Sequence, residues 1–507
     1  MKKKQLRWTL WTIASPFILF IILCILIYLP PIQNFLVDKA AVYASEATGM
    51  NISVGRISLS FPLNLVVTNV DAASPHNDTL LSVRRLQVNV QLLPLLKKQV
   101  EVDGISLQGA TVNSNDLIHG MRLNGTLGEL FISSHGVALD PETAIVNKVL
   151  LKDTDLSLCL NDTAAADTAA SDTTYWKIIL QDIDLQNVSF ALDMPLDSLS
   201  LAASLDNAIL RDGLIDLHKS AYSLQTFRIE NGRVRYDNGK PLAADSLSSG
   251  LDPSHIALTD IGVKLDSLYY GGRNMKAIIS QFVLKERSGV EIVSATGRMV
   301  SNDKVLRVPS LKLETRDSYL ELNAAMDWNA LDFKGEGLMS ARLMADIGKP
   351  DVVRFMGRMD EKFVRQYPSE PLRIRTGIDG DLNKLKLTTL TAELPGALGL
   401  FARGELTHLT DSLLRGGDIT LEAETKDLKF VSTLAEGIEI PYGTRLEGKF
   451  TMAGAKMGTD LLLMQPEAQA VAAADTIPIT VYNDSISVAD DFKMERAARL
   501  FAKYDLS

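Results

Sequence analysis

The chain contains very little cysteine. Its 507 residues include two cysteines, Cys24 and Cys159, and Cys24 lies inside a long apolar run near the N-terminus. A disulfide, a redox pair or a cysteine-based zinc site needs at least two thiols. The part of the chain after the apolar run has one, so it can form none of these. We therefore expect burial of apolar surface and backbone hydrogen bonds to hold that part together.

Excess positive charge and aromatic side chains are also scarce. Lysine and arginine number 52 against 62 aspartates and glutamates, which gives a net charge of −10, and aromatic residues make up 6% of the chain. Binding to nucleic-acid phosphates needs a positive surface, and stacking on bases needs aromatic rings. The composition therefore predicts no nucleic-acid partner.

Catalytic motifs are missing as well. The sequence has no HExxH, GxSxG or GxGxxG pattern and no GxxxxGK followed by Ser or Thr, and no two histidines lie within five residues of each other. A catalytic or metal-binding histidine normally needs a partner group held close to it. The six histidines are His76, His119, His135, His218, His255 and His408. We predict that the protein is not an enzyme and binds neither a metal ion nor a cofactor.

The most prominent feature that is present is the stretch from Trp8 to Leu29, which has no charged residue. As a helix it would be roughly 33 Å long, which matches one bilayer core. Tryptophan and tyrosine at its ends suit the two membrane interfaces. The residues that we expect to anchor it are Trp8, Trp11, Phe17, Phe20 and Tyr28.

The charges that flank this stretch predict its orientation. Residues 1–7 hold three lysines and an arginine, whereas the first cation after the stretch is Lys39. Positive flanks stay in the cytoplasm, so we expect a basic cytoplasmic tail at 1–7, a membrane span at 8–29 and an exported remainder. The alternative is a cleaved signal peptide, but the apolar run is longer than usual and no small-x-small cleavage site follows it promptly.

After the span, the hydrophobic period changes. Residues 30–50 place apolar side chains at helical spacing and end at Gly49, which predicts a short amphipathic helix next to the membrane. From Asn51 onward, apolar and polar residues alternate, which is typical of half-buried strands. We expect one repetitive β region over 51–463. At roughly 12 to 15 residues per strand and turn, about 450 residues would form some 30 to 37 strands.

One short sequence motif, here called the phrase, recurs along the β region. It consists of alternating apolar residues, then a turn-tolerant Asp, Gly or Asn, then a second alternating run. Repeated units of this kind favour an elongated β structure over a compact globule. The phrase occupies residues 100–112, 149–160, 179–190 and 227–236.

Three segments interrupt the pattern. Residues 161–174 are rich in Asp, Thr and Ala, which predicts a flexible loop. Helical spacing between Pro350 and Tyr367 predicts a surface helix over the sheet. The segment 464–507 is the hardest to interpret: residues 477–482 favour a strand, residues 490–504 favour a helix, and an open sheet edge at the end would indicate a truncated part of a longer protein.

Asp followed by Ser or Thr and then by an aliphatic residue or Thr is another small recurrence. Such pairs open turns through side-chain hydrogen bonds to the backbone. The triplet also resembles an acceptor consensus for periplasmic O-glycosylation in one group of Gram-negative bacteria, and the two interpretations are compatible. The candidate acceptors are Thr163, Thr168, Thr173, Ser246 and Ser412.

Taken together, the anchor, residues 32–41, residues 49–59 and residues 92–110 resemble the opening of AsmA-like proteins, specifically the TamB family of translocation and assembly module inner-membrane proteins. The resemblance is strongest over about the first 115 residues. Members of that family are longer and end in a domain that meets an outer-membrane barrel. No segment here looks like that domain.

The resemblance implies a mainly β fold: one transmembrane helix, then an elongated antiparallel sheet curled into a U-shaped apolar groove (a β-taco), with a few short helices. It implies a place in the Gram-negative inner membrane, with a cytoplasmic N-terminus and the bulk of the chain in the periplasm. The partners would be phospholipids, the inner membrane and, through a C-terminal part not seen here, an outer-membrane barrel of the TamA/BamA type.

Alternation gives every strand one apolar face, so the sequence itself nominates groove-lining residues. Two functions follow: a conduit that carries phospholipids between the two membranes, or a scaffold that passes unfolded outer-membrane or secreted β-barrel proteins along its sheet edges by strand addition. A closed β-solenoid that acts only as a spacer is a third possibility. The candidate lining residues are Val54, Val88, Val102, Leu107, Leu180, Leu311, Leu313 and Leu387.

Overall fold

The structure is a computed structural model of the chain. Two compact units make up the chain, residues 1–240 and residues 241–507, here called unit 1 and unit 2. The described residues are 39, 41–42, 45–46, 48–60, 64–74, 78–91, 102–114, 120–138, 142–161, 175–240, 250–332, 336–357, 361–434, 442–454, 456–465 and 496–505.

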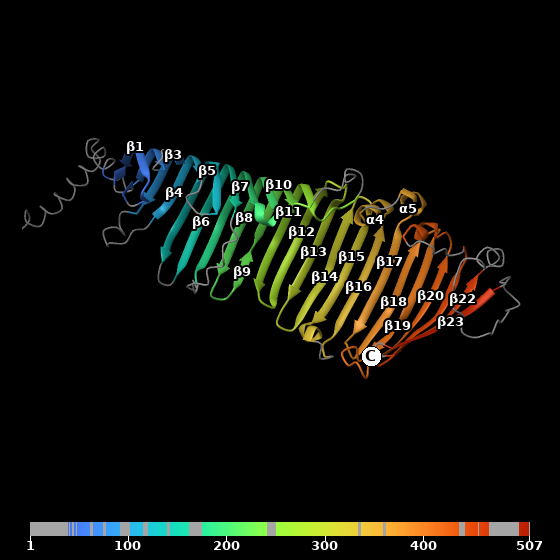
Figure 1. Ribbon diagram of the computed structural model, residues 1–507. Helices are drawn as coiled ribbons and strands as arrows, with labels where there is room; N and C mark the ends of the chain where they lie inside the picture. Colours follow the sequence, from blue (N-terminus) through green and yellow to red (C-terminus); the bar gives the residue numbers. More distant parts are fainter. Residues whose placement is uncertain are drawn as a thin grey trace, which may run out of the picture. The chain divides into compact units, whose positions relative to one another are not determined.

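In unit 1, each strand from β1 to β8 pairs with the next strand in sequence, and β10 pairs with β8 (Figure 1). Ser45 Oγ accepts a hydrogen bond from the backbone N–H of Ile52 at 3.0 Å and so links the helical residues around position 45 to the first strand. A 3₁₀ turn, η1, spans Pro195–Asp197. The strands are β1 (Asn51–Ser60), β2 (Asn64–Ala73), β3 (Thr79–Val90), β4 (Val102–Asn113), β5 (Met121–Ala138), β6 (Thr143–Leu160), β7 (Lys177–Met194), β8 (Leu199–Asp216), β9 (Ala221–Leu224) and β10 (Thr226–Asp237).

Neighbouring strands of unit 1 pair antiparallel, except β6 and β7. These two run parallel, with Thr143 opposite Lys177 and Cys159 opposite Asp193. A parallel pair cannot be joined by a tight turn, because the chain must return along the whole strand length before the second strand begins. The expected loop at 161–174 falls in this connection, and its residues from 162 onward lie outside the described residues.

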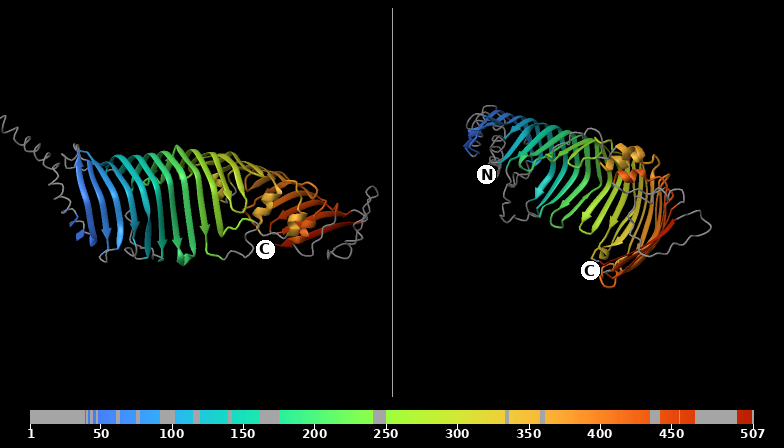
Figure 2. Two further views of the ribbon diagram at one scale, coloured as in Figure 1. Left: turned by 90° about the horizontal axis from the view of Figure 1, so that it is seen from above. Right: turned by 45° about the vertical axis from the view of Figure 1, so that its right-hand side comes forward.

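Unit 2 is also built of β-strands, which are mostly shorter than those of unit 1 and pair antiparallel with their neighbours in sequence (Figure 2). Its strands are β11 (His255–Gly271), β12 (Asn274–Glu286), β13 (Glu291–Ser301), β14 (Val305–Thr315), β15 (Tyr319–Asp327), β16 (Met339–Ile347), β17 (Leu372–Gly380), β18 (Lys384–Leu394), β19 (Leu398–Thr407), β20 (Gly416–Thr425), β21 (Arg445–Ala453), β22 (Lys456–Gln465) and β23 (Arg496–Asp505). Two 3₁₀ turns, η2 (Trp328–Asp332) and η3 (Lys429–Thr433), connect strands.

Two helices interrupt unit 2 between β16 and β17: α4 (Lys349–Phe355) and α5 (Glu361–Gln366). With η3 they enclose a buried apolar cluster, here called the rim cluster, at the ends of β18 and β19. Its buried members are Phe363, Tyr367, Leu394, Ala397, Leu428 and Phe430. The helix predicted between Pro350 and Tyr367 is therefore confirmed, as two short helices.

A buried carboxylate fixes α4 to the turn between β14 and β15. Asp351 is 1% exposed and accepts hydrogen bonds from the hydroxyls of Thr315 and Ser318, the latter at 2.6 Å. Arg354 Nη1 lies 3.1 Å from Asp351 and 2.8 Å from Asp317. A buried charge is tolerated only when it is paired and hydrogen-bonded, and Asp351 is both.

The sequence prediction was right in class and wrong in two particulars. The protein is mainly β with few helices. However, the described residues form 23 strands, fewer than the 30 to 37 expected, because strands such as β5 to β8 run for 18 residues. The helix expected at 490–504 is also wrong, since β23 pairs with β22 from Gln465↔Arg496 to Lys456↔Asp505. A full backbone ladder outweighs helix propensity there.

Among the residues that the structure describes, no helix is long and apolar enough to span a membrane. The anchor residues Trp8, Trp11, Phe17, Phe20 and Tyr28 lie outside those residues, as does the segment 477–482. Of the helix expected at 30–50, the described positions 39, 41–42, 45–46 and 48 are helical.

Candidate functional site

The strand register places apolar side chains in continuous rows across unit 1. Directly opposed residues in a sheet share a face, so the register shows which side chains lie next to each other. One row runs through nine strands and consists of Leu59, Leu65, Val88, Ile105, Ile132, Val149, Ile183, Leu210 and Phe227. A second, two positions away, consists of Ile57, Val67, Leu86, Leu107, Leu130, Leu151, Leu185, Ala208 and Ile229.

The neighbouring row faces the other way and is polar throughout. It consists of Arg56, Thr68, Arg85, Gln108, Glu129, Lys152, Gln186, Asn207 and Glu230. A sheet with one apolar and one polar face normally packs its apolar face on a core. We call the two faces of each unit its apolar face and its polar face.

A line of left-handed residues crosses unit 1 beside the polar row and is here called the bend line. Each of these residues has a positive φ, between 49° and 61°. At this line the strands skip one residue each: Thr68 pairs with Arg85 and Val70 with Val83, but Asn69 and Arg84 between them do not pair. The residues concerned are Asn69, Gly109, Asp153, Asn187 and Asn231.

At the bend line, the alternation of apolar and polar side chains along each strand shifts by one residue. The pairing register between strands does not change, because both partners skip one residue. On β2, Val67 belongs to the apolar row before the line and Val70 to an apolar row after it, three positions on instead of two. An extra left-handed residue bends a strand and re-aims its side chains. The rows beyond the line are again apolar, and one consists of Val54, Val70, Val83, Ala110, Leu127, Thr154, Val188 and Leu205, in which Thr154 is the single polar member.

Unit 2 builds a similar face from register alone. One row passes through ten strands from β13 to β22 without a polar residue. It consists of Ala295, Leu313, Leu320, Ala345, Ile374, Ala392, Leu400, Ala423, Leu446 and Leu463. On the polar face, arginines pair with carboxylates across strands, as Arg375 does with Asp346 at 2.7 Å.

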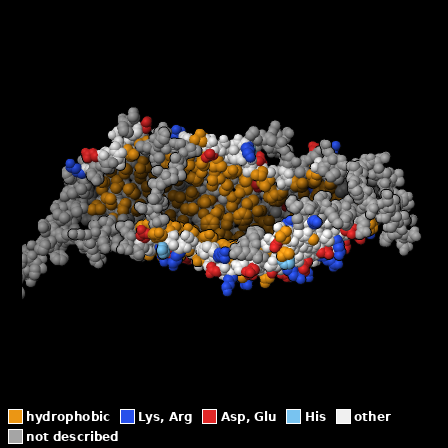
Figure 3. All heavy atoms as spheres, turned by 60° about the horizontal axis from the view of Figure 1, so that its bottom comes forward, with side chains coloured by type: hydrophobic (Ala, Val, Ile, Leu, Met, Phe, Trp, Pro, Cys, Tyr) orange, Lys and Arg blue, Asp and Glu red, His pale blue; other side chains and the backbone are white. Residues whose placement is uncertain are grey.

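One apolar row of unit 1 stays partly exposed in the described part of the chain. None of the nine residues in the row from Leu59 to Phe227 is buried, and Ile105 is 36% exposed. In a two-layer fold, a second layer would exclude water from such a row. Figure 3 shows hydrophobic side chains gathered in a hollowed face, with charged side chains along its borders.

The structure places the nominated lining residues as follows. Val88 and Leu107 lie in the two apolar rows of unit 1, and Val54 lies in the row beyond the bend line. Val102 is opposite Val90 at the start of β4, and Leu180 is between Val146 and Gly213.

In unit 2, Leu313 belongs to the row described above, Leu311 is opposite Leu322 two positions away, and Leu387 is opposite Ile378 and Gly404.

Of the glycosylation candidates, Ser412 is an exposed turn residue beside Asp411, whose Oδ1 accepts the backbone N–H of Leu413 at 2.8 Å. This is the side-chain turn that the triplet predicts. Thr163, Thr168, Thr173 and Ser246 lie outside the described residues.

Titratable groups with shifted pKa values lie away from the apolar rows. A hydrogen bond from His255 lowers the pKa of Asp252, and one from Lys285 to Asp260 raises the pKa of that lysine. Desolvation raises the pKa of Tyr367 in the rim cluster. Within the described part of the chain, no group of three or more His, Cys, Asp or Glu side chains could hold a metal ion.

Comparisons with protein-family models, with curated proteins and with solved structures gave no match. The interpretation of the site therefore depends on its own chemistry: long rows of aliphatic side chains, partly exposed, backed by a polar face.

Proposed function

We propose that this is a membrane-anchored, non-enzymatic protein of the Gram-negative envelope, whose apolar faces form a U-shaped groove that carries phospholipids between the inner and outer membranes. The observation that carries the proposal is the partly exposed apolar row from Leu59 to Phe227. Leaving such side chains in water forgoes roughly 1.5 to 3 kcal/mol per residue relative to full burial. An apolar ligand that covers these side chains would recover part of this free energy.

Acyl chains suit this face better than another protein layer does. Each CH₂ group that leaves water contributes about 0.8 kcal/mol, whatever its position along a row of aliphatic side chains. Neighbouring positions in the row are therefore nearly equivalent, and a lipid can move along the row without crossing a high barrier. Its headgroup stays in water at the border of the groove. No residue needs to act as a catalyst.

The test is to place the same charge on the two faces of one strand. Leu107 and Gln108 are adjacent on β4, the first in the apolar row and the second in the polar row. Leu107→Glu puts a carboxylate among acyl chains, which costs about 2.5 to 3.5 kcal/mol on membrane-insertion scales. Gln108→Glu puts the same group in water. We expect phospholipid that copurifies with residues 51–507 without detergent, counted by mass spectrometry, to fall several-fold in the first variant alone.

Leu421→Glu and Thr420→Glu on β20 repeat this comparison in unit 2, since Leu421 pairs with Ala402 and Gly448 while Thr420 pairs with Arg403 and Lys449. Equal lipid content in all four variants, or none in the unsubstituted protein, would contradict the conduit. It would favour the scaffold that passes β-strands along its edges, or the closed spacer.

A further inference from the structure

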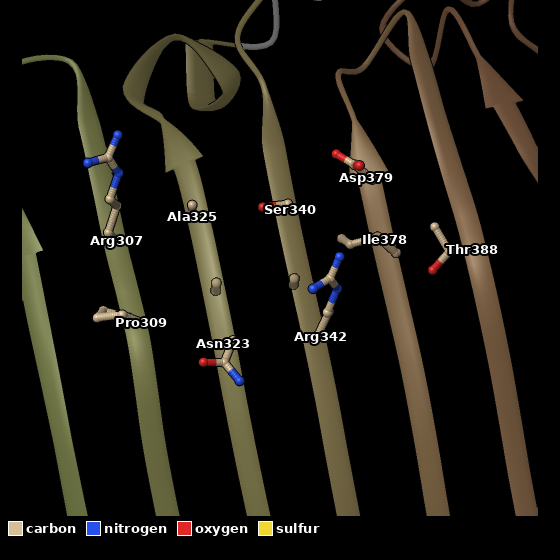
Figure 4. A pocket seen from close by; sticks show the side chains of 11 residues that line it. Arg307, Pro309, Asn323, Ala325, Ser340, Arg342, Ile378, Asp379 and Thr388 are labelled. Carbon is tan, nitrogen blue, oxygen red and sulfur yellow. The ribbon is translucent and has the colours of Figure 1, made fainter.

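The polar face of unit 2 has a hollow of its own. It has a volume of about 370 Å³ and is lined by residues from five consecutive strands, β14 to β18. Figure 4 shows Arg307 and Asp379 on either side of Ala325 and Ser340, with Arg342 two residues from Ser340 on the same strand. This hollow is separate from the apolar rows, because its charged side chains belong to the polar face.

Small residues between long ones create the hollow. Arg307, Ala325, Ser340 and Asp379 are directly opposed on four neighbouring strands. Strands lie about 4.8 Å apart, so Ala325 and Ser340 leave a gap about two strands wide between the longer side chains. Register shifts on both sides, between Val308 and Leu311 and between Gly377 and Ile378, disturb the sheet at its borders.

The two arginines differ from most others in unit 2. Arg373, Arg375 and Arg445 each form an ion pair with a carboxylate on a neighbouring strand. Among the described residues, neither Arg307 nor Arg342 has an ion pair or a hydrogen bond through its guanidinium. Two guanidinium groups at one hollow present many N–H donors in a geometry that suits phosphate oxygens.

The other polar side chains at the hollow indicate what a ligand needs besides a phosphate group. The amide of Asn323 lines the hollow and can both donate and accept. The carboxylate of Asp379 can only accept, and no described residue forms an ion pair with it. A bare phosphate would place its negative charge beside this exposed carboxylate, whereas an ester that also carries an ammonium or hydroxyl group can donate to it.

We propose that the hollow binds a phosphate ester that also carries an ammonium or hydroxyl group, with Arg307 and Arg342 on the phosphate and Asp379 on the ammonium or hydroxyl. The same chemistry occurs in a free ester such as phosphoethanolamine and in a phospholipid headgroup. The proposal stands apart from the groove, because every group that it uses lies on the polar face.

Isothermal titration calorimetry of the full chain in a detergent without phosphate tests it. We expect phosphoethanolamine to bind, and the Arg307→Gln, Arg342→Gln double variant to weaken binding at least tenfold. Arg228→Gln is the control, because Arg228 is an exposed strand arginine of unit 1 far from the hollow in sequence. Asp379→Asn should weaken binding of phosphoethanolamine more than binding of inorganic phosphate.

Two results would overturn the proposal: no heat of binding with millimolar phosphoethanolamine, or equal weakening by the double variant and by Arg228→Gln. A competition experiment with a short-chain, soluble phosphatidylethanolamine shows whether the ligand is a free ester or a lipid headgroup. If the lipid binds more tightly than the free ester, the hollow takes a lipid headgroup. If it binds no more tightly, the hollow takes a free ester. Lipid content of the groove is measured separately, so either function can fail alone.

Discussion

Units 1 and 2 both carry an apolar face, but they shape it by different means. In unit 1, a left-handed residue recurs on β2, β4, β6, β7 and β10 and bends the sheet along one line. In unit 2, from β12 onward, no described strand residue other than glycine has a positive φ, and the rim cluster packs α4, α5 and η3 onto the strand ends instead. Bending in unit 1 is therefore built into five of its strands, whereas unit 2 combines register shifts between strands with packing at its border.

The largest expected effect comes from the rim cluster. Phe363 is 2% exposed, and its ring centroid lies 5.4 Å from that of Tyr367 and 5.8 Å from that of Phe430. Truncating a buried aromatic side chain costs about 3 to 5 kcal/mol. We expect Phe363→Ala to lower the free energy of unfolding of unit 2 by that amount and to leave unit 1 unchanged. Hydrogen exchange resolved by peptide would measure both units in one experiment.

The matched control is Phe355→Ala on α4, because Phe355 is 57% exposed. A substitution at so exposed a site usually changes stability by less than about 0.5 kcal/mol. If Phe363→Ala also increased exchange in β1 to β8, or if both variants behaved alike, the rim cluster would not be what stabilises unit 2.

The next effect concerns the bend line. Asn187 has a φ of 51°, and its side-chain amide donates to Asp153 Oδ1 at 2.9 Å, which links two left-handed positions on β6 and β7. A left-handed conformation costs an ordinary residue about 1 to 2 kcal/mol, and a β-branched side chain is the least suited to it. Asn187→Val should therefore destabilise unit 1 by at least about 1 kcal/mol, as measured by denaturant unfolding.

Gln186→Val provides the control, since Gln186 is an exposed neighbour on the same strand that pairs normally with Lys152. Valine suits an ordinary strand position, so this variant should unfold like the unsubstituted protein. Asn187→Gly should keep the bend, because glycine adopts a positive φ without strain. Equal loss of stability in Asn187→Val and Asn187→Gly, with Gln186→Val unchanged, would show that position 187 matters for its side-chain contacts and not for its backbone.

The bend line also shows where sequence reasoning stopped. Alternation gave the β class and an apolar face, because period 2 is a local property of the chain. The recurring Asp, Gly or Asn looked like a boundary between two runs, yet it lies inside one strand, as in Leu185-Gln-Asn-Val188 on β7. The signal was available on β2, β4 and β7, where apolar residues step by three across such a position and by two on either side of it.

Other features could not be read from the sequence, since they depend on pairing between distant strands. Nothing local distinguishes the parallel pair β6 and β7 from an antiparallel hairpin. The hollow on the polar face needs the register of five strands to bring Arg307 and Arg342 to the same place. In β23, the run from Arg496 to Asp505 favours a helix by composition, and the ladder with β22 overrides it.

The smallest expected effect is a dependence of unit 2 on pH. His255, the first residue of β11, is 6% exposed, and its Nδ1 lies 2.8 Å from Asp252 Oδ2. This hydrogen bond lowers the pKa of Asp252 from its ordinary value of 3.8. A carboxyl with a lowered pKa in the folded state stabilises the protein above its unfolded pKa, and this contribution disappears as the pH falls through the folded value.

We expect Asp252→Asn to destabilise unit 2 at pH 7 and to make no difference once the pH is below the folded pKa, so that the two unfolding midpoints converge in acid. The gap at pH 7 should be smaller than that caused by Asn187→Val in unit 1, because Asp252 is 34% exposed and water screens the interaction. A constant gap between pH 7 and pH 3 would show that the Asp252 side chain matters for its shape and not for its charge. Convergence of the midpoints in acid would show that a charge stabilises the start of unit 2, whereas left-handed backbone residues bend unit 1.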